Sequence, residues 1–379
     1  MKILHTSDWH IGRTFHGHST TEHLTTVLEA IAREVEERRI DVVLISGDVF
    51  DSSAPAAAYF TILAGAIRAI RGAGAQVVIS SGNHDSATRL GFQSEWAALG
   101  GVHVITRADQ SWTPVVIGEV SFYGIPYLEP FLLKDSFPHE KLTTHEQVLG
   151  FVMGRIRADI ASRGSRSVVL SHCFAAGVQQ TDVERDVTAG GLGIVSTTVF
   201  DGADYVALGH IHGQATLAEN IRYSGAPLYY SFTEGGKKRG GWIVELDENG
   251  LGEVTWLDLP IPRRVTTLTD TIDELLSSSK YTEFERDWIS AVITDQVRPM
   301  DAMSRLHSRF PNCATLDFAP TFVADDSPQT YGSRVVGKSD LAVIDGFLEF
   351  VRNGQAAIES ETILVSEMLV ELAAEVSTR

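Results

Sequence analysis

The sequence predicts an α/β fold in which two β-sheets pack together and are flanked by helices. Short apolar runs, typical of strands inside a parallel sheet, alternate along residues 2–210 with longer segments of helical periodicity. Further strand-like segments follow at 221–224, 241–246 and 254–258. We expect these later strands to make the second sheet largely antiparallel.

Polar side chains follow five of the predicted strands at the points where the strands end. The strands are residues 2–6, 41–45, 76–79, 167–171 and 204–208. Ligands of open α/β sheets bind in the crevice beyond the carboxyl ends of the strands, so we expect these side chains to meet there. They are Asp8, His10, Asp48, Asn83, His84, Asp85, His172, His210 and His212.

Helices are predicted between these strands. The first begins at a capping box, Ser19-Thr20-Thr21-Glu22. A helix over 56–71 follows Pro55, and Ser52 and Ser53 are better placed to cap it than Asp48, which leaves Asp48 for a functional role. Further predicted elements are helices at 88–98 and 145–162 and strands at 102–105 and 114–124.

The rest of the chain divides into smaller parts. We expect a main domain at 1–262, a small α+β domain at 263–320, a polar linker at 321–338 and a C-terminal pair of amphipathic helices at 339–379. In the small domain, the pattern predicts a helix near 271–278, a strand near 287–294, a helix at 299–309 with Pro299 in its first turn, and a strand at 313–318.

Composition restricts the function. The net charge of −18 argues against DNA binding driven by a basic protein face alone, although bound divalent cations or a basic partner would offset it. The two cysteines, Cys173 and Cys313, are far apart and are expected to be reduced thiols. The N-terminal residues lack the apolar core of a signal peptide, and no apolar run approaches the length of a membrane span. We therefore expect a cytoplasmic protein with no membrane contact.

The polar cluster has the composition of a site for two metal ions. Without His84 and Asp85, the cluster offers two carboxylates, one amide and four imidazoles, and no thiolate. This set suits Mn²⁺, Fe²⁺ or Zn²⁺ in a site with one bridging carboxylate. Two such ions ~3.5–4 Å apart clamp an in-line phosphoryl displacement and supply hydroxide near neutral pH. His84 remains for proton donation to the leaving oxygen or hydrogen bonding to the phosphate, and we expect Asp85 to orient it.

The motifs Asp-x-His, Gly-Asp-x-x-Asp, Gly-Asn-His-Asp, a single His and Gly-His-x-His, in this order, resemble those of the calcineurin-like metallophosphoesterases. The resemblance implies that family's β-sandwich. It also implies one ion held by Asp8, His10, Asp48 and His212, and a second held by Asp48, Asn83, His172 and His210. Asp48 would bridge the two. Asp51 matches the second aspartate of the Gly-Asp motif but is not expected to be a ligand.

Within this superfamily, residues 6–13, 46–51 and 207–213 are similar to the SbcD-type nucleases, relatives of the Mre-type DNA-repair nucleases. The segments 223–232 and 297–302 also fit. One departure is Ala87, where that family has proline, and we expect it to affect the stiffness of the loop and not the chemistry.

This resemblance implies a manganese-dependent nuclease that cuts DNA ends and hairpins by 3′→5′ exonuclease and endonuclease action, in DNA repair, recombination and replication. It implies a nucleoid-associated homodimer whose C-terminal helices bind an SbcC-type ATPase, giving two nuclease and two ATPase chains. The small domain would cap the site and help to select DNA. Candidate DNA contacts are Arg13, His16, Arg89, Lys237, Lys238 and Arg239; each would otherwise be a solvated surface charge.

Two other functions are compatible with parts of the sequence. A small-molecule phosphodiesterase or nucleotidase would use the same metals, but it would not need the region beyond about residue 265. A non-catalytic scaffold of the same fold would be expected to have lost at least one ligand, whereas the set is intact and His84 is present.

Overall fold

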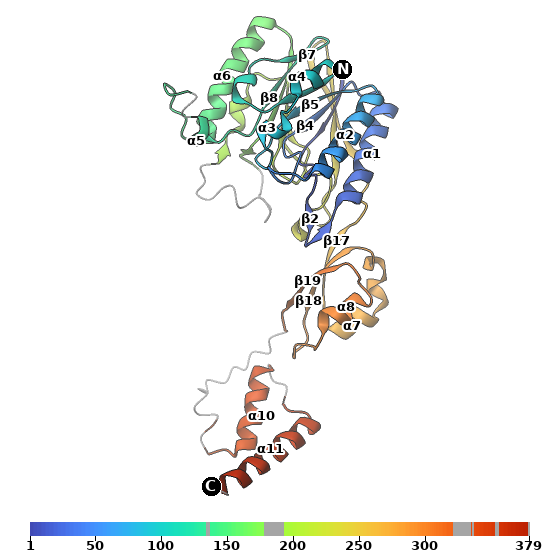
Figure 1. Ribbon diagram of the computed structural model, residues 1–379, viewed down its shortest axis with the longest axis vertical. Helices are drawn as coiled ribbons and strands as arrows, with labels where there is room; N and C mark the ends of the chain where they lie inside the picture. Colours follow the sequence, from blue (N-terminus) through green and yellow to red (C-terminus); the bar gives the residue numbers. More distant parts are fainter. Residues whose placement is uncertain (134–136, 178–192, 321–334, 336, 353–355, 378–379) are drawn as a thin grey trace. The chain divides into compact units, whose positions relative to one another are not determined.

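The computed structural model describes residues 1–133, 137–177, 193–320, 335, 337–352 and 356–377 (Figure 1). Contacts divide the chain into two compact units, Met1–Val265 and Thr266–Arg379, and each is described by itself. Of the predicted linker at 321–338, only residues 335, 337 and 338 are among those described. None of the described helices is long and apolar enough to cross a bilayer.

The first unit contains two six-stranded sheets with a shared apolar core between them. The first sheet has the order β16-β15-β1-β4-β5-β6. Its strands are β1 (Lys2–Thr6), β4 (Val42–Ser46), β5 (Gln76–Ser80), β6 (Val102–Ile105), β15 (Gly240–Asp247) and β16 (Gly250–Asp258). The second sheet has the order β13-β14-β12-β9-β8-β7. Its strands are β7 (Val115–Ile117), β8 (Val120–Ile125), β9 (Arg166–His172), β12 (Tyr205–Gly209), β13 (Ala215–Ala218) and β14 (Ile221–Tyr223).

The prediction that the second sheet is largely antiparallel is wrong. Strands β8, β9, β12 and β14 all run parallel, and only the edge strands β7 and β13 pair antiparallel with their neighbours. The hairpin β15–β16 belongs instead to the first sheet, where β15 pairs antiparallel with β1. Alternation of apolar residues identifies a strand but carries no information about its partner or direction.

Helices cover the outer faces of both sheets (Figure 1). Helices α1 (Thr21–Arg38) and α2 (Ala57–Gly72) contribute to the core of the first sheet, and α6 (His145–Arg163) contributes to the core of the second. The helix predicted at 88–98 is two short helices, α3 (Ala87–Leu90) and α4 (Ser94–Leu99). Shorter elements are α5 (Pro130–Leu133), β2 (Thr14–Phe15), β3 (His18–Ser19), β10 (Phe174–Ala175), β11 (Ile194–Val195), and 3₁₀ turns at Ala108–Gln110, Thr197–Phe200 and Phe232–Glu234.

Two predicted helix caps are wrong. The predicted capping box begins at Ser19, but the residue before α1 is Thr20, whose hydroxyl donates to the main-chain oxygen of Arg13 (2.7 Å) and does not cap the helix. Ser19 Oγ accepts the N–H of Thr21 (3.3 Å). Helix α2 starts after Ala56, beyond the reach of Ser52 and Ser53, and no side chain caps it.

The second unit has its own apolar core. A three-stranded sheet of β17 (Val265–Asp270), β18 (Trp288–Ile293) and β19 (Cys313–Phe318) is accompanied by α7 (Ile272–Ser277), a 3₁₀ helix (Ser279–Phe284) and α8 (Ala302–His307). Helix α8 begins after Asp301, so Pro299 is not in its first turn as predicted. Helices α10 (Asp340–Val351) and α11 (Glu359–Ser377) are joined by the ion pair of Arg352 and Glu361.

A histidine is buried between the two sheets of the first unit. His5 is fully buried, its Nδ1 lies 3.0 Å from the hydroxyl of Tyr205, and its Nε2 lies 3.1 Å from the main-chain oxygen of Leu208. Burial lowers the pKa of His5 to about 3, so the ring is neutral and both its nitrogens have partners. This contact connects β1 of the first sheet to β12 of the second.

We expect Tyr205→Phe to lower the free energy of unfolding by ~1–3 kcal/mol, because it leaves a buried imidazole nitrogen without its partner. Urea unfolding followed by circular dichroism measures this change. The matched control is Tyr123→Phe, which removes a hydroxyl that donates to the partly exposed Asp159 and should cost less. An equal loss in the two variants would contradict the role given to the His5 contact.

Candidate metal centre

The predicted ligands lie at the carboxyl ends of strands from both sheets. Strands β1, β4 and β5 of the first sheet lead to Asp8, His10, Asp48 and Asn83, and β9 and β12 of the second lead to His172, His210 and His212. Because these strands run parallel within each sheet, their ends lie at the same edge. The two carboxylates and four imidazoles are each no more than 5% exposed.

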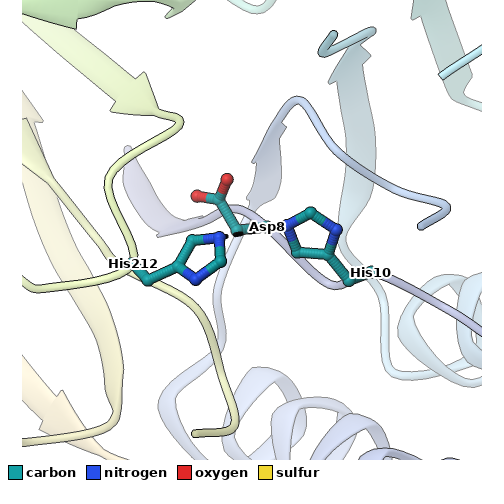
Figure 2. Close-up of side chains that lie close together, drawn as sticks. All are labelled: Asp8, His10 and His212. Carbon is teal, nitrogen blue, oxygen red and sulfur yellow. Dashed lines mark hydrogen bonds between the residues drawn. The ribbon is translucent and has the colours of Figure 1, made fainter. Parts of the chain in front are cut away.

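One group of ligating atoms contains Asp8 and His10, from the loop after β1, and His212, from the loop after β12 (Figure 2). One ligating atom from each lies within 4.8 Å of the others. The Nε2 atoms of His10 and His212 are 3.1 Å apart. Asp48 adjoins this group, with its Oδ2 3.5 Å from His10 Nε2.

A second group forms on the other side of Asp48. The amide oxygen of Asn83 lies 3.0 Å from His172 Nε2 and 3.2 Å from His210 Nδ1. His172 Nε2 is also 3.3 Å from Asp48 Oδ2. The Asp48 carboxylate therefore faces both groups, in the position that a bridging ligand requires.

These residues fit two divalent cations. Neighbouring ligands of an octahedral ion with bonds of about 2.1 Å lie about 3 Å apart, which is close to the separations between the ligating atoms here. Carboxylate, amide and imidazole donors without thiolate suit Mn²⁺, Fe²⁺ or Zn²⁺. In each group, several atoms with lone pairs are buried close together, and one bound cation would accept a lone pair from each of them.

The backbone at the site is strained. Four of the predicted ligands have positive φ angles, namely Asp8 (54°), His10 (43°), Asp48 (48°) and His210 (102°). Non-glycine residues seldom adopt this region, and each such residue costs of order 1–3 kcal/mol. Main-chain hydrogen bonds hold the loops in place, from Asp8 N to Gly47 O (3.1 Å) and from His10 N to Asp48 O (2.9 Å).

Two glycines make room for the ligands. Gly47 has a φ of 84°, and a Cβ atom there would overlap the ring of His172 at Nδ1. A Cβ atom at Gly82 would overlap Asp48 Oδ1. Any larger residue at either position would displace a ligand.

Burial and mutual charge determine the protonation of the site. Burial alone would raise the pKa of Asp48, but the charge and hydrogen bond of His172, with the charge of His10, hold it well below its usual range. Burial likewise disfavours the charged form of His172, but Asp48 outweighs it and raises the pKa of His172 to about 9. Burial raises the pKa of Asp8 to about 6 and lowers those of His10 and His210 to about 4 and 3.

His84 lies at the rim of the site, with its side chain 37% exposed. Its Nδ1 is 2.9 Å from the main-chain oxygen of Asp51, and its Nε2 is 4.0 Å from Asp48 Oδ2. The predicted orientation of this ring by Asp85 is wrong. The Asp85 carboxylate accepts hydrogen bonds from the main-chain N–H groups of Val49, Phe50 and Gly82, and so connects the loops after β4 and β5.

Two carboxylates lie beside the site, and only one of them, Asp51, was noticed in the sequence. The carboxylate of Asp51, which was not expected to be a ligand, lies 3.2 Å from His10 Nδ1 and 3.0 Å from Arg13 Nη1. Glu234 is fully buried, with Oε1 3.2 Å from His212 Nδ1 and Oε2 2.5 Å from Arg239 Nη2. Burial would raise the pKa of Glu234, but its contacts with His212 and Arg239 lower it to about 2. Glu234 ends a 3₁₀ turn and belongs to no motif, so the sequence carried no signal for it.

The structure separates the candidate DNA contacts into two kinds. Arg239 is 1% exposed and donates to the main-chain oxygen of His212, so its prediction as a DNA contact is wrong. Arg13 is half-buried and stacks on the Tyr230 ring as well as pairing with Asp51. The side chains of His16, Arg89, Lys237 and Lys238 are exposed.

Comparison with known proteins agrees with this geometry. The family model for calcineurin-like phosphoesterases matches residues 1–214. The chain belongs to this family. It is accordingly a metal-dependent phosphoester hydrolase with a dimetal site, in a mixed α/β fold.

Among solved structures, similar ones include the protein TT1561 of Thermus thermophilus, with 13% identity over 67% of this chain and 98% of that one and a TM-score of 0.39. A dimetal phosphatase from Danio rerio has 11% identity over 69% and 99%, with a TM-score of 0.38. A purple acid phosphatase from yellow lupin has 12% identity over 64% and 49%, with a TM-score of 0.36.

Metal binding should release a proton. With a pKa of about 9, His172 is an imidazolium at pH 7.5 in the metal-free protein and must lose its proton to bind a cation. Affinity for Mn²⁺ should therefore rise with pH up to about 9, and Asp8 should add to the competition below about pH 6. Calorimetry at about pH 7.5 in two buffers of different ionisation enthalpy measures the release. Equal heats in the two buffers would contradict it, and His172→Gln should abolish the difference.

Proposed function

We propose that the protein is an SbcD-type, manganese-dependent DNA nuclease that processes DNA ends and hairpins together with an SbcC-type ATPase, in repair, recombination and replication. The observation that carries this proposal is the buried pair of ligand groups on Asp48 with the exposed ring of His84 at its rim. The second unit, with a core of its own, favours a macromolecular substrate over a small ester.

The residues divide the chemistry between them. Two divalent ions at this centre would neutralise the phosphate and make a bound water a stronger nucleophile. His84 donates its Nδ1–H to the main chain of Asp51, which leaves Nε2 directed towards the centre. In the imidazolium form, Nε2 can donate a proton to the leaving oxygen or a hydrogen bond to the phosphate.

The charge distribution bears on how DNA would bind. The protein as a whole is strongly acidic, so non-specific attraction to phosphates must come from local groups. Lys237 and Lys238 are exposed on the segment that also carries Glu234. Arg89 is exposed on the short helix α3 after β5, and His16 in the turn between β2 and β3 after β1. These four residues, together with the cations, are the DNA contacts we propose.

A partner is proposed for the C-terminal helices. Helices α10 and α11 expose many apolar side chains in an acidic setting, which suits an apolar partner surface with basic residues around it. The exposed side chains include Phe347, Phe350, Val351, Ile363, Leu364, Met368, Val370 and Leu372. We propose the coiled-coil base of the ATPase as this partner, and retention of the ATPase by a chain lacking residues 339–379 would contradict it.

Self-association is proposed for the first unit. Phe92, Trp96 and Leu99, in and beside α4, are 73%, 70% and 89% exposed. Such large apolar side chains on one short segment are typical of an interface between protein copies. We propose that this segment contributes to the nuclease homodimer, and a monomer in light scattering at micromolar concentration would contradict it.

The purified chain with Mn²⁺ should cut a linear duplex and a hairpin DNA, and Asp48→Ala should abolish the cleavage because it removes the shared carboxylate. Gel analysis of end-labelled DNA measures both. Bis-p-nitrophenyl phosphate serves as the small-ester comparison. Hydrolysis of the small ester without DNA cleavage, even with the ATPase present, would favour a small-molecule phosphodiesterase or nucleotidase.

His84→Gln should retain both metal ions and lower DNA cleavage at least ~100-fold, because the ring acts on protons and is not a ligand. Metal content by atomic emission and cleavage rates with saturating Mn²⁺ separate the two effects. His139→Gln, the same change at an exposed histidine in the loop between α5 and α6, is the matched control. Loss of metal from His84→Gln would contradict this role.

A further inference from the structure

A buried ion pair lies directly behind one of the metal-ligand candidates. Glu234 and Arg239 are 0% and 1% exposed, and their side chains meet with Oε2 2.5 Å from Nη2. Burial of two charges carries a large desolvation cost, which can cancel the attraction between them. The presence of this pair is therefore better explained by a role other than stabilising the fold. Its contacts supply one, because both members of the pair contact His212.

Glu234 determines which nitrogen of His212 is available. Its Oε1 lies 3.2 Å from His212 Nδ1, and its Oε2 accepts the main-chain N–H of Tyr230 at 3.0 Å. A carboxylate only accepts hydrogen bonds, so the proton of the neutral ring lies on Nδ1. The lone pair is then on Nε2, the atom that faces His10 Nε2 at 3.1 Å.

Arg239 holds the main chain of the same residue. Its Nη1 donates to the carbonyl oxygens of His212 and, at 3.3 Å, Ala226. The guanidinium also lies over the Tyr229 ring, 4.4 Å from the centroid. Ring and backbone of His212 are thus both held by one ion pair, which leaves the side chain little freedom to turn away from the centre.

The two ligand groups differ in the partner of the imidazole nitrogen that faces away from the metal site. In the group with Asp8, His10 and His212, each ring faces a carboxylate on its far nitrogen, Asp51 for His10 and Glu234 for His212. In the other group, His172 Nδ1 faces the main-chain oxygen of Ser46 at 2.9 Å. A carboxylate partner makes an imidazole a stronger donor to a metal ion than a carbonyl does.

We propose that Glu234, neutralised by Arg239, is a positioning residue that orients His212 and selectively strengthens metal binding by the group of Asp8, His10 and His212. Loss of such a partner typically weakens metal binding about 10–100-fold. The inference rests on the dimetal centre of the proposed function, and not on DNA as the substrate.

The test is Mn²⁺ binding by the full-length chain, measured by electron paramagnetic resonance of free Mn²⁺ and by calorimetry. Glu234→Gln removes the charge, whereas Glu234→Asp keeps the charge for Arg239 but withdraws the carboxylate from His212. Both should weaken one of the two binding steps about 10–100-fold and leave the other within about threefold. The matched control is Asp204→Asn, since Asp204 accepts hydrogen bonds from Ser167 at the opposite end of β12 and should leave both steps unchanged.

A readout of the ring itself separates orientation from general stability. In metal-free protein labelled with ¹⁵N-histidine, His212 should show the tautomer protonated on Nδ1, and Glu234→Asp should change that signal while the melting temperature stays close to that of Asp204→Asn. Unchanged binding steps in both Glu234 variants would overturn the proposal. Equal weakening of the two steps, in proportion to a lower melting temperature, would overturn it as well.

The outcomes also separate this inference from the proposed function. If the wild-type chain cuts DNA and the Glu234 variants bind both ions normally, the positioning role is wrong and the nuclease stands. If the wild-type chain cuts no DNA but the variants lose one binding step, the substrate is wrong and the positioning role stands.

Discussion

The carboxylate of Asp48 places a negative charge where almost no water reaches, and the surrounding structure compensates it. His10 and His172 lie 3.5 and 3.3 Å from its Oδ2, and the main-chain N–H of His84 donates to its Oδ1 at 2.9 Å. Those partners come from both sheets. The site can therefore form only when the two sheets pack face to face. Without cations, the remaining charge is met by a proton on His172, whose place a metal ion would take.

Holding the ligands in this geometry lowers the stability of the folded protein. Strained φ angles at ligands, glycines that permit no side chain and a buried ion pair all oppose folding in isolation. The apolar core between the sheets and the cores under the helices offset these terms. Rigid strands then hold the ligands at separations suited to two ions before any ion arrives, which reduces the entropic cost of binding.

Family membership and site geometry establish a metal-dependent phosphoester hydrolase, and the choice of substrate depends on features outside the centre. The calcineurin-like centre recognises a phosphate, which DNA and small esters share. Three features favour DNA as the substrate: the second unit, the exposed basic residues, and the apolar side chains exposed on the C-terminal helices. An enzyme for a small ester would need none of them. The proposed assembly with an ATPase would also explain how so acidic a protein acts on a polyanion.

The seven ligand candidates were recognisable in the sequence, because polar residues directly after buried strands lie at one edge of a parallel sheet. That the edges of two sheets meet was decided by the packing of the sheets. Most strands and the long helices were predictable for a similar reason, since periodicity is a local property of the chain. The tertiary structure alone decided the relative direction of the strands in the second sheet and the starts of α1 and α2. It also decided the backbone partners of Asp85 and the burial of Glu234 and Arg239. Each of these depends on which distant segment lies opposite. In the sequence Arg239 is simply the third of three basic residues; its environment is set by His212 and Ala226, which β-strand packing brings to it.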